Sequence, residues 1–289
     1  MTEELRKRLM TAAVAVPILL LLIYVGGVPF LLLIITFIIA GIWELNRIME
    51  NRGYHPQPEI SLLAGAGMAL VAYSGNALYL NMYLTLALLA ILIFQLGRQD
   101  VSLAMNGFST TIAGVFYIGW LLSHAVLVRN FGLSLRTESV KSAFLLRDSH
   151  LGHDVGLFFT IMVLACVFLN DTGAYFAGKN LGKKKLAPTI SPNKTWEGFW
   201  GGLATAWVTA CLVNLVFQSH FSYWHCLAIG TLVAVFGTLG DLLESLIKRD
   251  AKIKDSGTFF PGHGGVLDRL DSILFSFPVV YYYLRIIFS

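Results

Sequence analysis

The chain has 289 residues, of which 56% are hydrophobic and only 13% are charged. Soluble domains carry about 25% charged residues, so this composition excludes one or two soluble domains. Apolar runs of about 18 or more residues recur from end to end, which is the length of a membrane-spanning helix. The sequence therefore predicts an all-α, polytopic integral membrane protein. Its partners include the lipid bilayer, and we expect no nucleic acid among them.

About nine spans are predicted, separated by short polar loops whose Pro and Gly residues end the helices. The third span is short and rich in Gly and Ala. The predicted spans run over residues 9–25, 28–43, 60–73, 77–96, 110–128, 155–177, 196–217, 224–247 and 270–288.

Three regions follow from this pattern. Residues 1–128 hold about five N-terminal spans, and residues 129–154 form an extracytoplasmic connecting loop. Residues 155–289 hold about four spans and form the predicted catalytic region. Asp148, His150, His153 and Asp154 are either a metal cluster or an incidental collection of loop residues.

Lysine and arginine placement predicts the orientation. Arg6, Lys7 and Arg8 place the N-terminus in the cytoplasm. With nine crossings, four further loops that carry Lys or Arg fall on the same side, and the 129–154 loop falls on the other. We therefore expect a bacterial-type inner or plasma membrane protein whose polar site, between the C-terminal helices, faces the cytoplasm.

The stretch from Gly240 to Asp271 concentrates the charge, with eleven of the chain's 38 charged residues (21 basic and 17 acidic). Its Pro261–Gly265 segment cannot continue a helix and leaves backbone N–H groups free to face an anion. Carboxylates for a hard divalent cation, lysines for phosphate and a glycine turn together indicate a polyphosphate site.

Two acids, Asp171 and Asp241, lie inside apolar runs. An acid inside a span costs about 2.5–3.5 kcal/mol, so such residues are usually functional or paired. The alternative is that each is a neutralised or lysine-paired acid that joins neighbouring helices. Asp241 and Asp268, with Asp171 or Asp271, are candidate oxygen ligands for Mg²⁺.

Lys194 follows Ser191, Pro192 and Asn193. Proline suits a first helical turn and Ser191 can cap it, which predicts that Lys194 lies near a helix N-terminus, where anions bind. The alternative is an interfacial anchor. Small-residue spacings at Gly198-x3-Gly202 and Gly173-x3-Ala177 indicate close helix packing. The three cysteines lie in apolar runs without metal-ligand spacing and are interpreted as buried hydrophobes.

The charged stretch resembles the signature of the CDP-diacylglycerol synthases, or phosphatidate cytidylyltransferases. The signature spans residues 245–271, and its matching positions are Ser245, Ile247, Lys248, Arg249, Lys254, Asp255, Gly257, Phe260, Pro261, His263, Gly264, Gly265, Val266, Asp268, Arg269, Leu270 and Asp271. The resemblance extends to 191–198 and 171–175, and so covers about the C-terminal 120 residues.

The resemblance implies that CMP is transferred from CTP to phosphatidic acid, which gives CDP-diacylglycerol and pyrophosphate. It implies Mg²⁺, with the number of cations left open, and a homodimer is compatible with the sequence. The implied catalytic residues are Asp171, Lys194, Asp241 and Asp268, and the implied metal ligands are Asp171, Asp241, Asp268 and Asp271. Implied substrate-binding residues are Ser191, Asn193, Lys248, Arg249, Lys254, Asp255, His263, Gly264, Gly265 and Arg269. His263 orients a ligand or caps the turn, and Arg269 binds substrate or pairs with an aspartate. The alternative functions are another CTP-dependent lipid enzyme, such as a lipid kinase, and an ion-coupled transporter.

Overall fold

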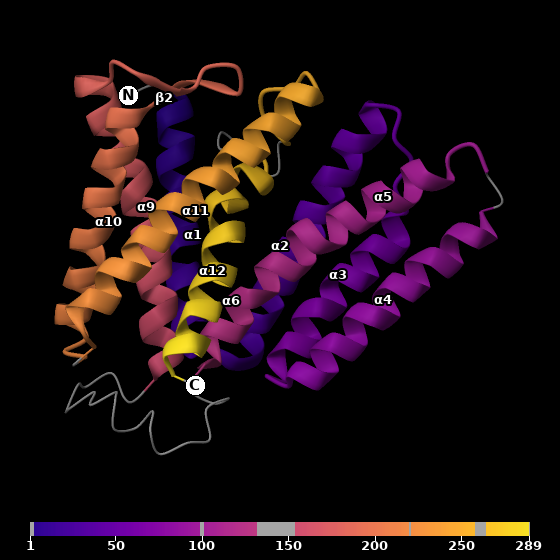
Figure 1. The fold of residues 1–289 in the computed structure, drawn as a ribbon, viewed down its shortest axis with the longest axis horizontal. Coiled ribbons are helices and arrows are strands. Elements are labelled where there is room, and N and C mark those ends of the chain that lie inside the picture. Colours follow the sequence, from indigo (N-terminus) through magenta and orange to yellow (C-terminus); the bar gives the residue numbers. More distant parts are fainter. Residues whose placement is uncertain (1–2, 99–100, 132–153, 220, 258–263, 289) are drawn as a thin grey trace. The chain divides into compact units, whose positions relative to one another are not determined.

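A computed structural model describes residues 3–98, 101–131, 154–219, 221–257 and 264–288 (Figure 1). These residues fold almost entirely into α-helices, with one short two-stranded sheet. Within this part of the chain, seven helices are long and apolar enough to cross a membrane: Gly27–Asn51, Ala77–Gly97, Ala104–Arg129, Val155–Leu181, Trp196–Val216, Tyr223–Asp250 and Leu267–Ile287. The prediction of a helical, polytopic membrane protein is confirmed.

The two other predicted spans are shorter apolar helices. One is the Ala15–Val25 part of α1 (Glu3–Val25), and the other is α3 (Pro58–Tyr73). The Gly- and Ala-rich third span is thus as short as its sequence indicated. The fifth predicted span begins earlier than expected, at Ala104. The count of nine crossings stays a prediction.

The chain forms two compact units. The first unit comprises residues 1–127 and 247–270, and the second comprises residues 128–246 and 271–289. One boundary lies beside the predicted division after residue 128. Most of the signature, residues 247–270, belongs to the first unit, although it lies within the C-terminal region of the sequence.

The predicted 129–154 loop is described only at its ends. Arg129 ends helix α6, and its Nη1 lies 2.7 Å from an Asp154 carboxylate oxygen. Asp154 also caps the next helix by accepting a hydrogen bond from the Leu157 amide at 2.9 Å. Asp148, His150 and His153 lie outside the described residues, so the metal-cluster alternative stays untested.

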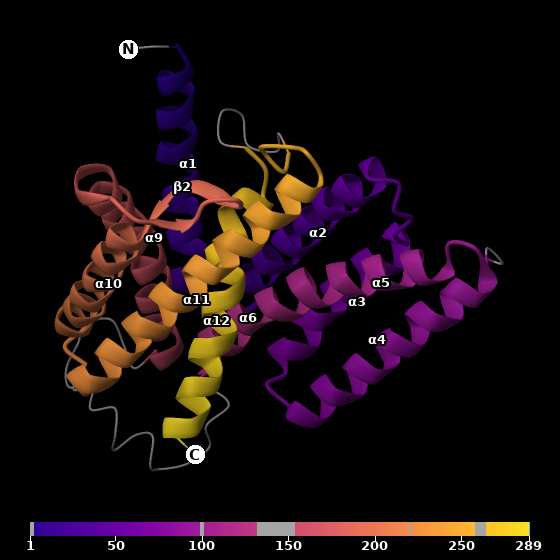
Figure 2. The same ribbon diagram turned by 45° about the horizontal axis from the view of Figure 1, so that its top comes forward.

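The first unit packs its helices through small residues and buried hydrogen bonds. Its elements are α1, α2 (Gly27–Asn51), α3, α4 (Ala77–Gly97), α5 (Ala104–Gly114), the π-helical turn η1 (Val115–Trp120) and most of α6 (Leu121–Arg129), together with residues 247–270. Figure 2 shows α3, α4 and α5 running side by side. Gly119 meets the backbone of Gly65, where any side chain would separate α3 from η1. The Asn46 amide donates to the Ser61 hydroxyl at 2.9 Å and so links α2 to α3.

The second unit is built around an antiparallel pair of long helices, α9 (Val155–Leu181) and α10 (Trp196–Val216). A Cβ on Gly202 would lie 3.1 Å from the Cβ of Ala174, and one on Gly198 would lie 2.9 Å from the Ala174 carbonyl oxygen. The close packing predicted from the glycine spacing is therefore confirmed. Parts of α11 (Tyr223–Asp250) and α12 (Leu267–Ile287) complete this unit.

A β-hairpin that the sequence did not predict joins α9 to α10. Strands β1 (Lys185–Ala187) and β2 (Ser191–Thr195) pair antiparallel across one end of the two helices (Figure 1). The Glu197 carboxylate accepts hydrogen bonds from the Lys183 and Lys184 amides at 3.0 and 3.2 Å. The hairpin is thereby fastened to the first turn of α10.

The predicted cap of α10 was wrong. Ser191 and Pro192 lie in β2, and the helix begins at Trp196. Thr195 is the cap, because its hydroxyl accepts a hydrogen bond from the Gly198 amide at 3.1 Å. Proline has no backbone N–H group to donate, and an edge strand tolerates this as well as a first helical turn does, so Pro192 can lie in β2. Lys194 still lies close to the helix N-terminus, as predicted.

Candidate active site

In the second unit, three aspartates and one lysine from four elements come together. We call Asp171 (α9), Asp241 (α11), Asp271 (α12) and Lys194 (β2) the aspartate–lysine group. The Lys194 ammonium lies 2.5 Å from an Asp241 carboxylate oxygen. Asp171 and Asp271 each interact electrostatically with both Asp241 and Lys194. Three carboxylates and one ammonium leave an excess of negative charge.

Local hydrogen bonds orient these carboxylates. The Asn170 amide donates to Asp171 at 3.3 Å, and the Ser245 hydroxyl donates to Asp241 at 3.3 Å. The Ser272 backbone N–H donates to Asp271 at 2.6 Å. The side chains of Lys194 and Asp241 keep 23% and 31% of their surface exposed. The group is therefore held in place yet stays open to a ligand.

The first unit holds a second polar cluster, the signature group, which consists of Lys248, Ser256, Gly265 and Asp268. One oxygen of Asp268 lies 2.7 Å from the Lys248 ammonium. Its other oxygen accepts hydrogen bonds from the Ser256 amide and hydroxyl, both at 3.0 Å, and from the Gly265 amide at 2.9 Å. Both side chains of the ion pair are largely buried, at 16% and 13% exposure. Asp268 thus closes the signature loop onto the start of α12.

Glu44 is a functional candidate that the sequence analysis missed. It lies in α2, is 2% exposed, and accepts hydrogen bonds from the Val266 and Leu267 amides at 3.0 Å each. The Ser256 hydroxyl also donates to it at 3.1 Å. The sequence could have pointed to it, because Glu44 lies at the end of an apolar run, where an acid is costly unless it has a partner.

The predicted anion-binding turn is only partly described. Gly264 has φ +80°, which supports a turn there, while Pro261–His263 lie outside the described residues. The amides of Gly265, Val266 and Leu267 do face anions, but these anions are the protein's own carboxylates, Asp268 and Glu44. These three amides are therefore already engaged, and a substrate phosphate has to be bound by other groups.

Comparison with known proteins decides the family. Residues 6–287 match the profile of the cytidylyltransferase family. The chain belongs to this family. A protein of Bacillus subtilis (strain 168) named phosphatidate cytidylyltransferase is 35% identical over 295 residues, which covers 98% of each chain. One of the same name from Synechocystis sp. is 32% identical over 290 residues, covering 96% of this chain and 95% of the other. A third, from Staphylococcus aureus (strain COL), is 45% identical over 125 residues, covering 43% of this chain and 48% of the other.

The remaining predicted site residues of this cytidylyltransferase lie on both units. Arg249, Lys254, Asp255 and Arg269 are exposed in the first unit, while Ser191 is partly buried and Asn193 is exposed on β2 of the second unit. His263 lies outside the described residues. Within the units, Asp241 is paired with Lys194, and Asp268 is paired with Lys248.

The magnesium prediction is not decided by these positions. In the described part of the cytidylyltransferase, no three His, Cys, Asp or Glu side chains lie close enough to form a metal shell. The oxygen donors and the excess negative charge of the aspartate–lysine group nevertheless suit Mg²⁺, which keeps several waters and needs only one or two carboxylates from a protein.

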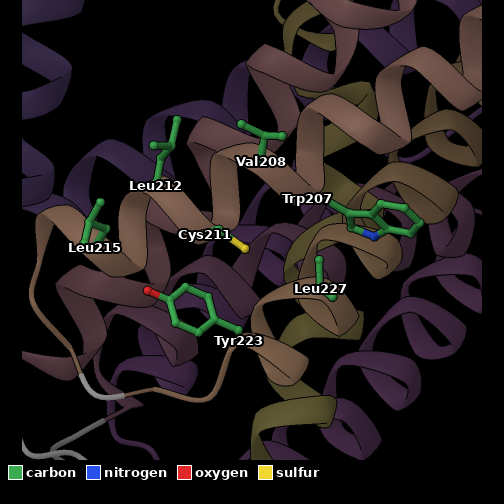
Figure 3. A pocket seen from close by; sticks show the side chains of 7 residues that line it. All are labelled: Trp207, Val208, Cys211, Leu212, Leu215, Tyr223 and Leu227. Atoms are coloured by element: carbon green, nitrogen blue, oxygen red, sulfur yellow. The ribbon is translucent and has the colours of Figure 1, made fainter.

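An apolar groove of about 330 Å³ lies elsewhere in the second unit. Figure 3 shows its lining, which comes from α10 and the start of α11: Trp207, Val208, Cys211, Leu212, Leu215, Tyr223 and Leu227. This lining carries no charged group, so the groove does not fit a nucleotide triphosphate. Cys166 and Cys226 are buried, as the sequence predicted, while Cys211 is only partly covered.

Proposed function

We propose that this chain is a phosphatidate cytidylyltransferase. A phosphate oxygen of phosphatidic acid attacks the α-phosphorus of CTP, the bond between the α-phosphorus and its bridging oxygen breaks, and pyrophosphate leaves. The products are CDP-diacylglycerol and pyrophosphate. The attacking oxygen already carries negative charge, so the reaction needs alignment and charge neutralisation more than it needs a strong general base.

The aspartate–lysine group carries this proposal. Its charges lie in spans that are otherwise apolar, where an unpaired carboxylate is costly. Asp171, Asp241 and Asp271 come from three helices. Asp241 forms an ion pair with Lys194 of the hairpin, and Asp171 and Asp271 interact electrostatically with both. A purely structural ion pair needs one acid and one base. The surplus of carboxylates is what a site for a cation and a polyphosphate requires.

Mg²⁺ would be held by Asp241, with Asp171 or Asp271 beside it, all of them in the second unit, while the predicted ligand Asp268 belongs to the first unit. When bound, the cation would neutralise charge on the triphosphate. Lys194, whose ammonium pairs with Asp241 and whose side chain is partly exposed, would hold a phosphate as a point charge.

The signature group supports substrate binding in a different way. Lys248 and Asp268 hold the loop that begins after α11, and the exposed side chains of Arg249, Lys254 and Arg269 are candidates for the triphosphate or the lipid phosphate. We place the site on the cytoplasmic side of the membrane, where CTP is available and the diacyl tails can stay in lipid. A homodimer stays a prediction, which cross-linking in native membranes would test.

The decisive experiment supplies purified protein in lipid nanodiscs with CTP and phosphatidic acid in the presence of Mg²⁺. We expect pyrophosphate and a lipid that carries the cytidine monophosphate, in equal amounts. Release of CDP with a newly phosphorylated lipid would identify a CTP-dependent lipid kinase instead. Absence of both products, with ion-driven uptake in proteoliposomes, would favour the transporter alternative.

A further inference from the structure

Glu44 is an acidic residue placed where an acid is costly. It lies in the apolar helix α2 and is 2% exposed. A charge that is removed from water has to be paired or hydrogen-bonded. Its described partners are hydrogen-bond donors that come from residues more than 200 positions away, in the signature loop and at the start of α12.

Both carboxylate oxygens of Glu44 are used. One accepts the Val266 amide, and the other accepts the Leu267 amide and the Ser256 hydroxyl, at distances of 3.0, 3.0 and 3.1 Å. The two amides belong to the N-terminus of α12, where free N–H groups and the helix dipole favour a negative charge. Glu44 therefore caps a helix to which it is not adjacent in sequence.

The loop backbone is fitted closely to this carboxylate. A Cβ on Gly257 would lie 2.5 Å from one oxygen of Glu44, and a Cβ on Gly265 would lie 2.5 Å from the other. Side chains at these two positions would push the loop away. The glycines and Glu44 thus form one arrangement in which the acid defines the path of the chain between α11 and α12.

We propose that Glu44 is a positioning residue for the cytidylyltransferase reaction. Through its carboxylate it holds Ser256 and the start of α12. The start of α12 carries Asp268, which pairs with Lys248 of α11, and the exposed Arg269. Glu44 touches neither the substrate nor the metal ion. This inference rests on the proposed function, and it assigns a part in the reaction to the N-terminal helices, which the signature itself does not include.

Glu44→Gln is the sharpest variant. Glutamine has nearly the same size and is cheaper to bury, so the protein should still fold. However, it has a single acceptor oxygen, and its NH₂ group would face a backbone donor. The matched control is Glu50→Gln, because Glu50 lies on the same helix and is exposed. Gly257→Ala is a second variant that perturbs the same contact from the loop side and leaves α2 intact.

The experiment combines hydrogen exchange of the 264–270 segment with steady-state kinetics in nanodiscs. For Glu44→Gln and Gly257→Ala we expect faster amide exchange at Val266 and Leu267, and kcat about tenfold lower, with KM for CTP and phosphatidate changed by less than about threefold. Glu50→Gln should match the wild type in both measurements.

Unchanged exchange in Glu44→Gln would overturn the proposal. So would unchanged kcat per folded molecule with only a lower melting temperature, because that is the result of a purely structural role. Should the wild type not turn over CTP, the proposed function fails, and the exchange comparison still decides whether Glu44 holds this segment.

Discussion

At the scale of single residues, two lysine–aspartate pairs organise the polar parts of the two units. Lys194 pairs with Asp241 at 2.5 Å, and Lys248 pairs with Asp268 at 2.7 Å. Their surroundings differ. Asp268 accepts three further hydrogen bonds from its own loop, whereas Asp241 lies among other carboxylates. The first pair is thus available to a ligand, and the second is part of the loop's internal structure.

The first residue-scale prediction concerns Lys194. Lys194→Arg should lower kcat/KM about tenfold or more, nearly as much as Lys194→Ala, because a planar guanidinium cannot take the place of a compact ammonium beside Asp241. Lys185→Arg, at an exposed position on the same hairpin, should be harmless. Pyrophosphate release at varied CTP and phosphatidate checks this. An arginine variant with normal kinetics would leave Lys194 as an interfacial anchor.

The second residue-scale prediction separates the two aspartates. Asp241→Asn and Asp268→Asn should each abolish turnover even at saturating Mg²⁺, because an amide is a poorer ligand than a carboxylate. Only Asp268→Asn should also speed hydrogen exchange in the signature loop, since it loses charge-assisted bonds to Ser256 and Gly265. Activity within a few-fold of the wild type in either variant would remove that residue from the proposed metal site.

At the scale of elements, glycine determines how closely α9 and α10 approach. The lipid around the helices offers no hydrophobic driving force for their association, so packing has to supply it. Gly201 lies against the side chain of Ala177 and the carbonyl oxygen of Gly173, which leaves no room for a Cβ. This contact joins α10, which begins directly after the strand that carries Lys194, to α9, which carries Asp171, and so it positions both residues.

The element-scale prediction is that Gly201→Ala destabilises the protein by about 1–3 kcal/mol through overpacking, although alanine is the better helix former. Gly97→Ala is the matched control, since a Cβ there would meet nothing within 4 Å. Thermal unfolding in detergent measures the difference. Equal melting temperatures for the two variants would show that the α9–α10 contact adapts more easily than its geometry indicates.

At the scale of the whole molecule, charge decides how the spans thread the membrane. Basic residues in the N-terminal segment and in both motif loops give the predicted cytoplasmic bias. Lys184 and Lys252 are exposed in the described structure. Lys184 lies between α9 and β1, and Lys252 follows α11. Each is therefore a suitable reporter for the loop in which it lies.

The whole-molecule prediction is that both lysines face the cytoplasm. Lys184→Cys and Lys252→Cys, made in a Cys211→Ser background, should resist impermeant thiol reagents in intact cells and react after the membrane is opened. The remaining cysteines, Cys166 and Cys226, are buried and should stay silent. Labelling of either reporter from outside would contradict the proposed orientation.

Much of this protein follows from its sequence because the membrane imposes simple rules. The apolar runs predicted the helices, since a span in lipid has to satisfy its backbone internally. The glycine spacing predicted the α9–α10 contact. The free-energy cost of a carboxylate inside an apolar span pointed to Asp171 and Asp241. The structure places both in the aspartate–lysine group together with Lys194 and Asp271.

Other features were decided by contacts between residues that are distant in the sequence. The hairpin from Lys185 to Thr195 depends on Glu197 binding the amides of Lys183 and Lys184, which no local periodicity shows. Only the tertiary structure brings Glu44 to the start of α12 and so assigns the signature loop to the first unit. The physical reason is that a sequence pattern indicates which groups are costly to bury, whereas the partner that offsets this cost is chosen by the packing of the whole chain.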